Sequence, residues 1–363
     1  MEALRCEKIP IECIKYITRL TNSRFKLRLI VVGFGIVGQS FAKLILSRAA
    51  DLYNTYGVNP RIVACIDKGG AVVCPSGIDL QKLLDIKKIK GTVGSYRSEG
   101  NKWAVNDIVE QIDSEVLLEL TPTNLQNGEP GITNIVSAMR SGKHVITANK
   151  GPLALAFPSL MELANYNNVI LRFSGTVGGG TPILEFAKRC LKGDRILSFK
   201  GILNGTTNYI LTRMEEGLSF ENALGDAQEK GFAEAIPQLD VDGYDAAAKV
   251  SIIANWVMGM KTTIYDVERN GIARVTLKSI DEAQKRNNAI KLVGMTQNKK
   301  LIVKPTEVSK FDPICVNGTL NAVTFSSEHS GRQTIIGPGA GGMETASAIL
   351  RDLIEIKNTI YTI

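Results

Sequence analysis

The stretch LDVDGYDAAAKVSIIANW, residues 239–256, combines carboxylates and a lysine with a strongly apolar run. Asp245 and Lys249 are four residues apart, so on a helix they share one face. No charged residue follows Lys249 until Lys261, and a helix that is apolar on most sides is buried. A surface Asp–Lys pair would need an exposed face, which this segment does not offer. A buried lysine beside a carboxylate is instead typical of a functional site.

A second lysine, Lys150, follows the predicted strand HVITAN at its carboxyl end. Open α/β sheets bind their ligands at this end of the strands, so Lys150 is well placed for chemistry. Its position alone is equally compatible with a solvated loop lysine. The chain has two histidines, His144 and His329, so acid–base chemistry is expected from lysines and carboxylates.

The sequence GFGIVG, residues 33–38, has the GxGxxG spacing of a dinucleotide-binding turn. It directly follows an apolar strand and opens a helix, which is the context that gives the motif meaning. Gly33 permits the tight turn, Gly35 admits a pyrophosphate to the backbone, and Gly38 lets helix and strand pack closely. The phosphates would rest on the helix N-terminus.

Asp67 ends the next predicted strand, RIVACID, where dinucleotide folds usually place the residue that contacts the ribose. It lies 29 positions after Gly38, because the crossover RAADLYNTYGVNP is long. An acidic residue here favours NAD, whereas the adjacent Lys68 would attract the 2′-phosphate of NADP. The sequence therefore leaves both cofactors open.

Alternating strands and helices over the first half of the chain predict a parallel sheet wound in βαβ units. These strands are expected at 27–32, 61–67, 115–121 and 144–149. A second sheet is expected from strands at 168–173, 195–204, 300–308 and 321–327, with helices at 206–217, from 244 and after 276. The fold class is α/β, with a Rossmann-type doubly wound domain and a second α+β domain. We expect an N-terminal extension (1–25, with a surface helix), a dinucleotide-binding domain (26–150, completed by 331–363) and a second domain (151–330).

The composition is that of a globular protein, with 44% hydrophobic and 22% charged residues. No apolar run approaches the roughly 18 residues of a membrane span, and charged residues interrupt the first 25, so we expect a cytoplasmic location without membrane contact. The net charge of +7 comes from basic residues interspersed with acidic ones, which argues against nucleic acid binding. The six cysteines form no CxxC pair, and we expect free thiols.

Seven motifs, in family order, make the chain similar to the homoserine dehydrogenases. They are GFGIVG, LTPTNLQNGEPG, HVITANKGPLA, SGTVGGGTPIL, GILNGTTNYIL, EKGFAEAIPQLDVDGYDAAAKV and GPGAGGMETASA. The resemblance runs from about residue 27 to the C-terminus. It implies the NAD(P)-dependent interconversion of L-homoserine and L-aspartate 4-semialdehyde, a step toward threonine, methionine and isoleucine.

The resemblance also implies roles for individual residues. Lys249 would be the proton donor or acceptor, with Lys150 and Asp245 beside it. The substrate would be bound by Glu234, Asp240 and the loop Asn204, Gly205 and Thr206. The cofactor would be held by Gly33, Gly35, Ile36, Val37, Gly38, Asp67, Thr121, Lys150, Gly339 and Gly341. The second domain would also form a homodimer through its sheet.

The chain departs from the family pattern at two places. The family often binds sodium with a glutamate and backbone carbonyls, here those of Val177, Gly179 and Thr181. Ser174 stands where the glutamate is expected, so this sodium site lacks its anionic ligand. The sequence also ends soon after the GPGAGG helix, so we expect a short, monofunctional form without a C-terminal regulatory domain.

Two other functions compete with this interpretation. One is a dehydrogenase of the same plan that acts on a different amino-acid carbonyl compound. The other is a dinucleotide-sensing regulatory protein without turnover, which would lack the lysines or carboxylates that this sequence retains.

Overall fold

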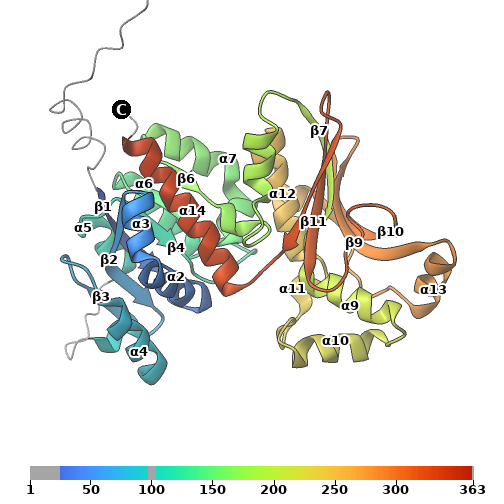
Figure 1. Cartoon of the computed structure of the whole chain (residues 1–363), viewed down its shortest axis with the longest axis horizontal. Coiled ribbons are helices and arrows are strands. Elements are labelled where there is room, and N and C mark those ends of the chain that lie inside the picture. Colours follow the sequence, from blue (N-terminus) through green and yellow to red (C-terminus); the bar gives the residue numbers. More distant parts are fainter. Residues whose placement is uncertain (1–24, 97–103, 362–363) are drawn as a thin grey trace, which may run out of the picture.

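The computed structural model describes residues 25–96 and 104–361, and the expected N-terminal helix lies outside these ranges. Two six-stranded sheets occupy separate lobes (Figure 1). The predicted mixture of one doubly wound sheet and one α+β unit is confirmed. No helix of the described residues is long and apolar enough to cross a membrane.

The first sheet has the strand order β3-β2-β1-β4-β5-β6. Its strands are β1 Phe25–Val32, β2 Val58–Asp67, β3 Gly70–Val73, β4 Val116–Glu119, β5 His144–Thr147 and β6 Leu171–Arg172. Five of them are parallel, and β3 turns back antiparallel to β2. The strand order reverses at β1 and β4, and a crevice at such a reversal is the usual ligand site.

Helices cover both faces of the first sheet. They are α2 Ile36–Ser47, α3 Ala49–Thr55, α4 Leu80–Lys90, α5 Val105–Gln111, α6 Gly131–Arg140, α7 Lys150–Tyr166 and α14 Gly342–Tyr361. In β1, Ile30 and Val32 pack into the core shared with α5 and α6, whereas Leu29 and Val31 pack into the core shared with α2 and α14. The continuous apolar run of β1 is explained by this burial on both faces. The C-terminal α14, red in Figure 1, packs on α2, so the chain returns to the first lobe as expected.

The second sheet has the order β12-β11-β7-β9-β10-β8 and is antiparallel except where β8 meets β10. Its strands are β7 Ile196–Ile202, β8 Val267–Arg269, β9 Asn288–Gln297, β10 Lys300–Ser309, β11 Leu320–Ser327 and β12 Arg332–Pro338. Its helices are α8 Ile183–Glu185, α9 Gly205–Glu215, α10 Phe220–Glu229, α11 Gln238–Val241, α12 Tyr244–Met258 and α13 Leu277–Lys285. Short 3₁₀ or π segments are η1 Val93–Tyr96, η2 Ser174–Thr176, η3 Phe186–Cys190 and η4 Ile264–Asp266.

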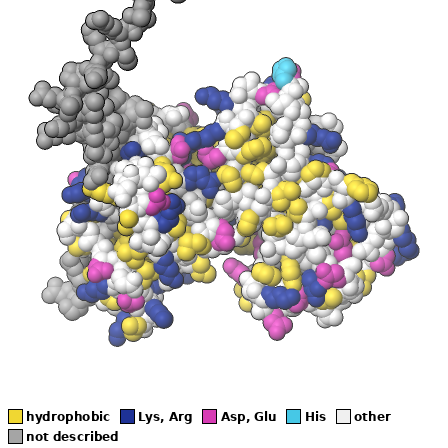
Figure 2. All heavy atoms as spheres, viewed as in Figure 1, with side chains coloured by type: hydrophobic (Ala, Val, Ile, Leu, Met, Phe, Trp, Pro, Cys, Tyr) yellow, Lys and Arg dark blue, Asp and Glu magenta, His cyan; other side chains and the backbone are white. Residues whose placement is uncertain are grey.

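One strand assignment was wrong. The segment 168–173 was expected in the second sheet, but its strand β6 pairs in parallel with β5 of the first sheet. Its two paired residues are half-buried or buried, so the apolar sequence did not indicate which sheet it joins. The strands β3, β8, β9 and β12 were not predicted. Figure 2 shows basic and acidic side chains interspersed over the visible face, as the sequence suggested.

Candidate active site

A cavity of about 790 Å³ lies at the point where the strand order of the first sheet reverses. It is lined by Val32–Val37, Ile66–Gly69, Lys87, Gly91, Thr92, Val105, Leu120–Thr123, Pro130, Asn134, Ala148 and Glu234. The predicted cofactor residues Gly33, Gly35, Ile36, Val37, Asp67 and Thr121 therefore share this cavity, which is named the dinucleotide cavity after that prediction. Gly38, Lys150, Gly339 and Gly341, also predicted for the cofactor, are not among the residues that line it.

The GFGIVG turn has the geometry of a dinucleotide cradle. Gly33 has φ +99°, and a Cβ there would lie 2.4 Å from the carbonyl oxygen of Leu120. A Cβ at Gly38 would lie 2.6 Å from the Gly33 oxygen, whereas one at Gly35 would meet nothing within 4 Å. No side chain caps the N-terminus of α2, so its first N–H groups are free of a side-chain partner. These features fit a pyrophosphate group.

Asp67 is held by a network that the sequence did not suggest. Its carboxylate accepts hydrogen bonds from Lys87 Nζ at 2.6 Å, Thr92 Oγ1 at 2.8 Å and the backbone N–H groups of Val93 and Gly69 at 2.9 Å. Burial alone would raise the pKa of Asp67, but Lys87 and the other donors outweigh it and hold the pKa below its ordinary value. Lys87 therefore places a second positive charge, besides Lys68, in the cavity wall.

Asp245 joins two lysines from different lobes. Its Oδ2 is 2.8 Å from the ammonium of Lys249, and its Oδ1 is 3.4 Å from that of Lys150. Lys249 lies on α12 and is 6% exposed, whereas Lys150 is the first residue of α7. Burial alone would raise the pKa of Asp245, but the two ammonium charges hold it well below its ordinary value. The predicted burial of Lys249 beside a carboxylate is confirmed.

Asn204 connects this ion cluster to Asp240. Its Nδ2 donates to Asp240 Oδ1 at 2.6 Å and to Asp245 Oδ2 at 2.9 Å, while its Oδ1 accepts from Thr207 N and caps α9. Burial and the charge of Asp245 raise the pKa of Asp240. The pKa values of the two carboxylates are therefore shifted in opposite directions. Asp245 faces two ammonium groups, whereas Asp240 does not form an ion pair among the described residues.

The remaining predicted substrate residues lie around this cluster at different depths. Gly205 is the first residue of α9, directly after Asn204. Thr206 donates its hydroxyl hydrogen to the carbonyl of Phe232 at 2.7 Å. Glu234 is exposed and lines the dinucleotide cavity. Glu234 thus belongs to the second lobe but borders the cavity that contains the GFGIVG turn.

The glycine loop of the expected sodium site packs against the GPGAGG loop. A Cβ at Gly179 would lie 3.2 Å from the backbone of Gly339, and the carbonyl of Thr181 already accepts the N–H of Ile183 at 2.8 Å. Gly341 directly precedes α14. The described residues contain no cluster of three or more His, Cys, Asp or Glu side chains that could hold a metal ion.

Ser174, at the position of the family glutamate, has a different partner. Its hydroxyl donates to Asp352 Oδ1 on α14 at 2.6 Å, and its N–H donates to Oδ2 at 2.8 Å. Burial raises the pKa of Asp352 to about 6. Nearby, Arg351 Nη2 donates to the carbonyl of Gly180 at 3.0 Å. The positively charged guanidinium of Arg351 therefore contacts this glycine loop.

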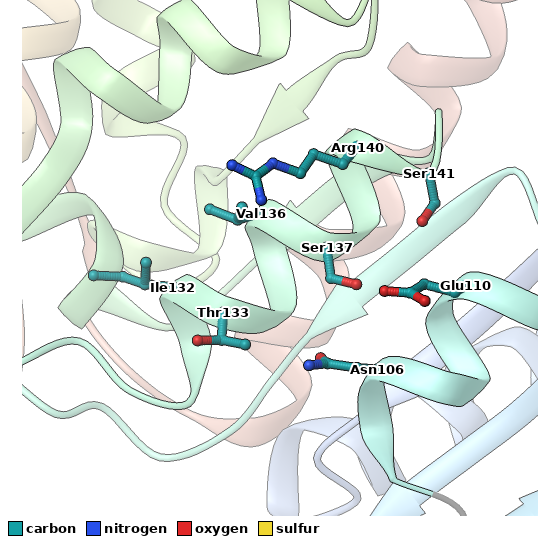
Figure 3. A pocket seen from close by; sticks show the side chains of 8 residues that line it. All are labelled: Asn106, Glu110, Ile132, Thr133, Val136, Ser137, Arg140 and Ser141. Atoms are coloured by element: carbon teal, nitrogen blue, oxygen red, sulfur yellow. The ribbon is translucent and has the colours of Figure 1, made fainter.

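Two further hollows differ from the dinucleotide cavity in the residues that line them. One, of about 1130 Å³, shares Lys68 and Thr121 with it and reaches Tyr244, Tyr265 and Arg269 of the second lobe. The other, of about 540 Å³, lies between α5 and α6, where Asn106 and Glu110 face Thr133 and Ser137 (Figure 3). The hollow in Figure 3 contains none of the predicted site residues.

Comparison with known proteins identifies the family. The sequence model of the homoserine dehydrogenase family matches residues 182–354, and that of the glutamate/leucine/phenylalanine/valine dehydrogenases matches residues 12–127. A homoserine dehydrogenase of Methanocaldococcus jannaschii is 44% identical over 332 residues, which cover 91% of this chain and 98% of that protein. The chain belongs to the homoserine dehydrogenase family. An NAD(+)-dependent homoserine dehydrogenase of Pseudomonas canavaninivorans is 39% identical over 92% of this chain and 96% of its own length.

Solved homoserine dehydrogenase structures share the fold. A putative homoserine dehydrogenase from Archaeoglobus fulgidus superposes with a TM-score of 0.84 at 39% identity, covering 91% of this chain and 99% of the other. A hyperthermophilic archaeal homoserine dehydrogenase in complex with NADPH gives a TM-score of 0.80 at 28% identity, covering 92% and 98%. The resemblance inferred from the seven motifs is therefore confirmed. The roles of individual residues stay predictions.

Sequence reasoning missed two residues of this homoserine dehydrogenase site. Lys87 lies 20 positions after its partner Asp67, on a helix that was not predicted from the sequence. Glu119 is the last residue of β4 and fully buried, where its charge is unexpected. The only sequence signal for Glu119 is a carboxylate within the otherwise apolar run EVLLELT.

Proposed function

We propose that this homoserine dehydrogenase interconverts L-homoserine and L-aspartate 4-semialdehyde with NAD(P), using Lys249 as the proton donor or acceptor. The observation that carries the assignment is the Asp245 carboxylate, which joins the buried Lys249 to Lys150 across the two lobes. Bound NAD(P) would supply or accept the hydride. The cavity that contains the GFGIVG turn, Asp67 and Thr121 would hold it.

Lys249 would donate a proton to the substrate oxygen or accept one from it. Its ammonium donates to Leu203 O at 2.6 Å and to Asp245, which leaves one N–H for a substrate atom. In the reducing direction that N–H would protonate the developing alkoxide, and in the oxidising direction the neutral amine would accept the hydroxyl proton. Lys150 would add positive charge near the same oxygen.

Asp240 and Glu234 would bind the amino group of the substrate. Both are carboxylates on the second lobe, and charge-assisted hydrogen bonds to an ammonium are stronger than neutral ones. The loop Asn204–Thr206 would form one wall, because Asn204 already holds both Asp240 and Asp245 in place.

Steady-state turnover of L-homoserine with NAD and with NADP, side by side, tests this function. We expect formation of reduced nicotinamide with at least one cofactor and much slower turnover of other amino-acid alcohols. A preference for a different alcohol would favour the related-dehydrogenase alternative, and binding without turnover would favour the sensing protein.

Replacing Asp67 with Ser is expected to improve the use of NADP relative to NAD. The carboxylate repels a 2′-phosphate, and its loss would also release the ammonium of Lys87, now 2.6 Å away, to bind that phosphate. The ratio of kcat/KM values for the two cofactors is the measurement. The matched variant Asp67→Ser/Lys87→Ala should lose the gain, and an unchanged ratio in Asp67→Ser would exclude Asp67 from ribose recognition.

We also propose three features of the whole protein. A homodimer would form through the second sheet, where Leu320 and Ile336 are exposed apolar residues on neighbouring strands.

The chain would divide into a dinucleotide-binding and a catalytic domain, and the pairing of β6 favours a boundary after residue 172 rather than after residue 150. Sodium binding at Val177, Gly179 and Thr181 stays a prediction that would depend on backbone carbonyls alone.

A further inference from the structure

Glu119 is a fully buried carboxylate that does not line the dinucleotide cavity but contacts residues that do. It accepts hydrogen bonds from Thr121 N at 2.9 Å, Asn134 Nδ2 at 2.7 Å and Asn149 Nδ2 at 3.4 Å, and also from the Thr121 hydroxyl. Thr121 and Asn134 line the cavity, and Asn149 caps α7 one residue before Lys150. Glu119 thus connects three elements that shape the site.

The partners of Glu119 favour an ionised carboxylate. Three of them are N–H groups, which can only donate, and an ionised carboxylate can only accept. Burial raises the pKa of Glu119, while the hydrogen bonds from Thr121, Asn134 and Asn149 oppose this rise. A neutral carboxyl group would carry an O–H donor, and the N–H groups around it cannot accept a hydrogen bond. The Thr121 oxygen would be its one possible acceptor among these partners.

This arrangement fixes the polarity of the Thr121 hydroxyl. Its single hydrogen is donated to Glu119, and its oxygen also accepts from Asn149 Nδ2 at 3.1 Å. A hydroxyl has one donor and two acceptor positions, so one acceptor position remains. Because Thr121 lines the cavity, that position can serve a bound ligand.

The place of Thr121 indicates which half of the dinucleotide it meets. Asp67 ends β2 and Thr121 follows β4, on opposite sides of the GFGIVG turn after β1. A dinucleotide that crosses this reversal point, with its adenosine ribose at β2, has its nicotinamide on the β4 side. The carboxamide of nicotinamide carries an amino group, which needs an acceptor.

We propose that Glu119 is a positioning residue that makes Thr121 an acceptor for the amino group of the nicotinamide carboxamide. The proposal rests on the NAD(P)-dependent function proposed above. It explains why a buried charge stands at the end of β4, where an apolar residue would avoid the cost of desolvation.

The test compares three ligands by calorimetric titration: NAD, 3-acetylpyridine adenine dinucleotide and ADP-ribose, or their 2′-phosphorylated counterparts if NADP is the cofactor used. The acetylpyridine analogue has a methyl group in place of the amino group, and ADP-ribose lacks the ring. The unsubstituted protein should bind NAD about five- to tenfold more tightly than the analogue, as expected for one hydrogen bond.

Glu119→Gln should bring this ratio close to one while binding of ADP-ribose changes less than about twofold. The glutamine amino group can donate to the Thr121 oxygen, so the hydroxyl would turn its hydrogen toward the cavity. Thr121→Val should have the same effect even if Glu119→Gln does not fold, and Thr121→Ser should retain the ratio. Asp352→Asn is the matched control, because it removes another buried carboxylate away from the cavity and should retain the ratio.

Two results would overturn the proposal while leaving the function intact. One is a normal NAD-to-analogue ratio in Glu119→Gln and Thr121→Val. The other is a parallel loss of NAD and ADP-ribose binding in Glu119→Gln, which would mean that Glu119 supports the fold of the cavity as a whole. Failure of the unsubstituted protein to bind ADP-ribose would instead contradict the dinucleotide function, and the proposal with it.

Discussion

Lys249→Ala is expected to lower kcat by about 10²–10⁴-fold, the range typical of a lost general acid–base group. The variant should fold, because Asp245 keeps Lys150 as an ionic partner at 3.4 Å and the carbonyl of Leu203 keeps a hydrogen bond from Asn321. Binding of the dinucleotide should be nearly unchanged, since Lys249 does not line its cavity. Steady-state kinetics and a fluorescence titration with the reduced cofactor measure the two effects.

Lys291 provides a matched control for this variant. It is likewise a buried lysine, 3.7 Å from Glu215, but it lies on β9 away from the proposed site. Lys291→Ala should lower the thermal midpoint and leave kcat within a few-fold. If Lys249→Ala keeps the original kcat while Lys150→Ala abolishes it, the proton-transfer role belongs to Lys150.

Asp245→Asn is expected to reduce both stability and turnover. The substitution keeps the shape of the side chain but leaves two ammonium groups, one of them buried, without their carboxylate. Breaking a buried ion pair from one side costs about 3–5 kcal/mol, and we expect the lower end because the Asp245 side chain is 15% exposed. We also expect kcat to fall by about 10²-fold or more, because Lys249 would lose the carboxylate that orients its ammonium.

The loss of stability in Asp245→Asn should depend on pH in a definite direction. The pKa of Asp245 is lowered in the folded protein, so its ionic contribution is fully present above the ordinary value of 3.8 and is lost as the pH falls through the lower folded pKa. The free energies of unfolding of the two proteins, from urea denaturation, should therefore differ most near neutral pH and converge in strong acid. Asp242→Asn is the control, because Asp242 forms no ion pair among the described residues; an equal loss there would refute the role of Asp245.

Much of the first sheet could be predicted because its signals are local. The apolar run of β1, the glycine spacing of GFGIVG and the helix that follows are properties of adjacent residues, and the structure has them as expected. The burial of Lys249 was also predictable, because a helix without a polar face must be covered. The position of β6 was not, because a two-residue strand with apolar neighbours fits either sheet.

The sequence by itself determined the family, the dinucleotide turn and the pairing of Asp245 with Lys249, since each depends on residues within one motif or one helix turn. Only the tertiary structure decided that Lys150 joins the same carboxylate, that Lys87 neutralises Asp67 and that Glu119 orients Thr121. The contact of Ser174 with Asp352, 178 residues away, belongs to the same group. These contacts form between elements distant in the chain, and their polar partners face one another only after the sheets and helices have packed.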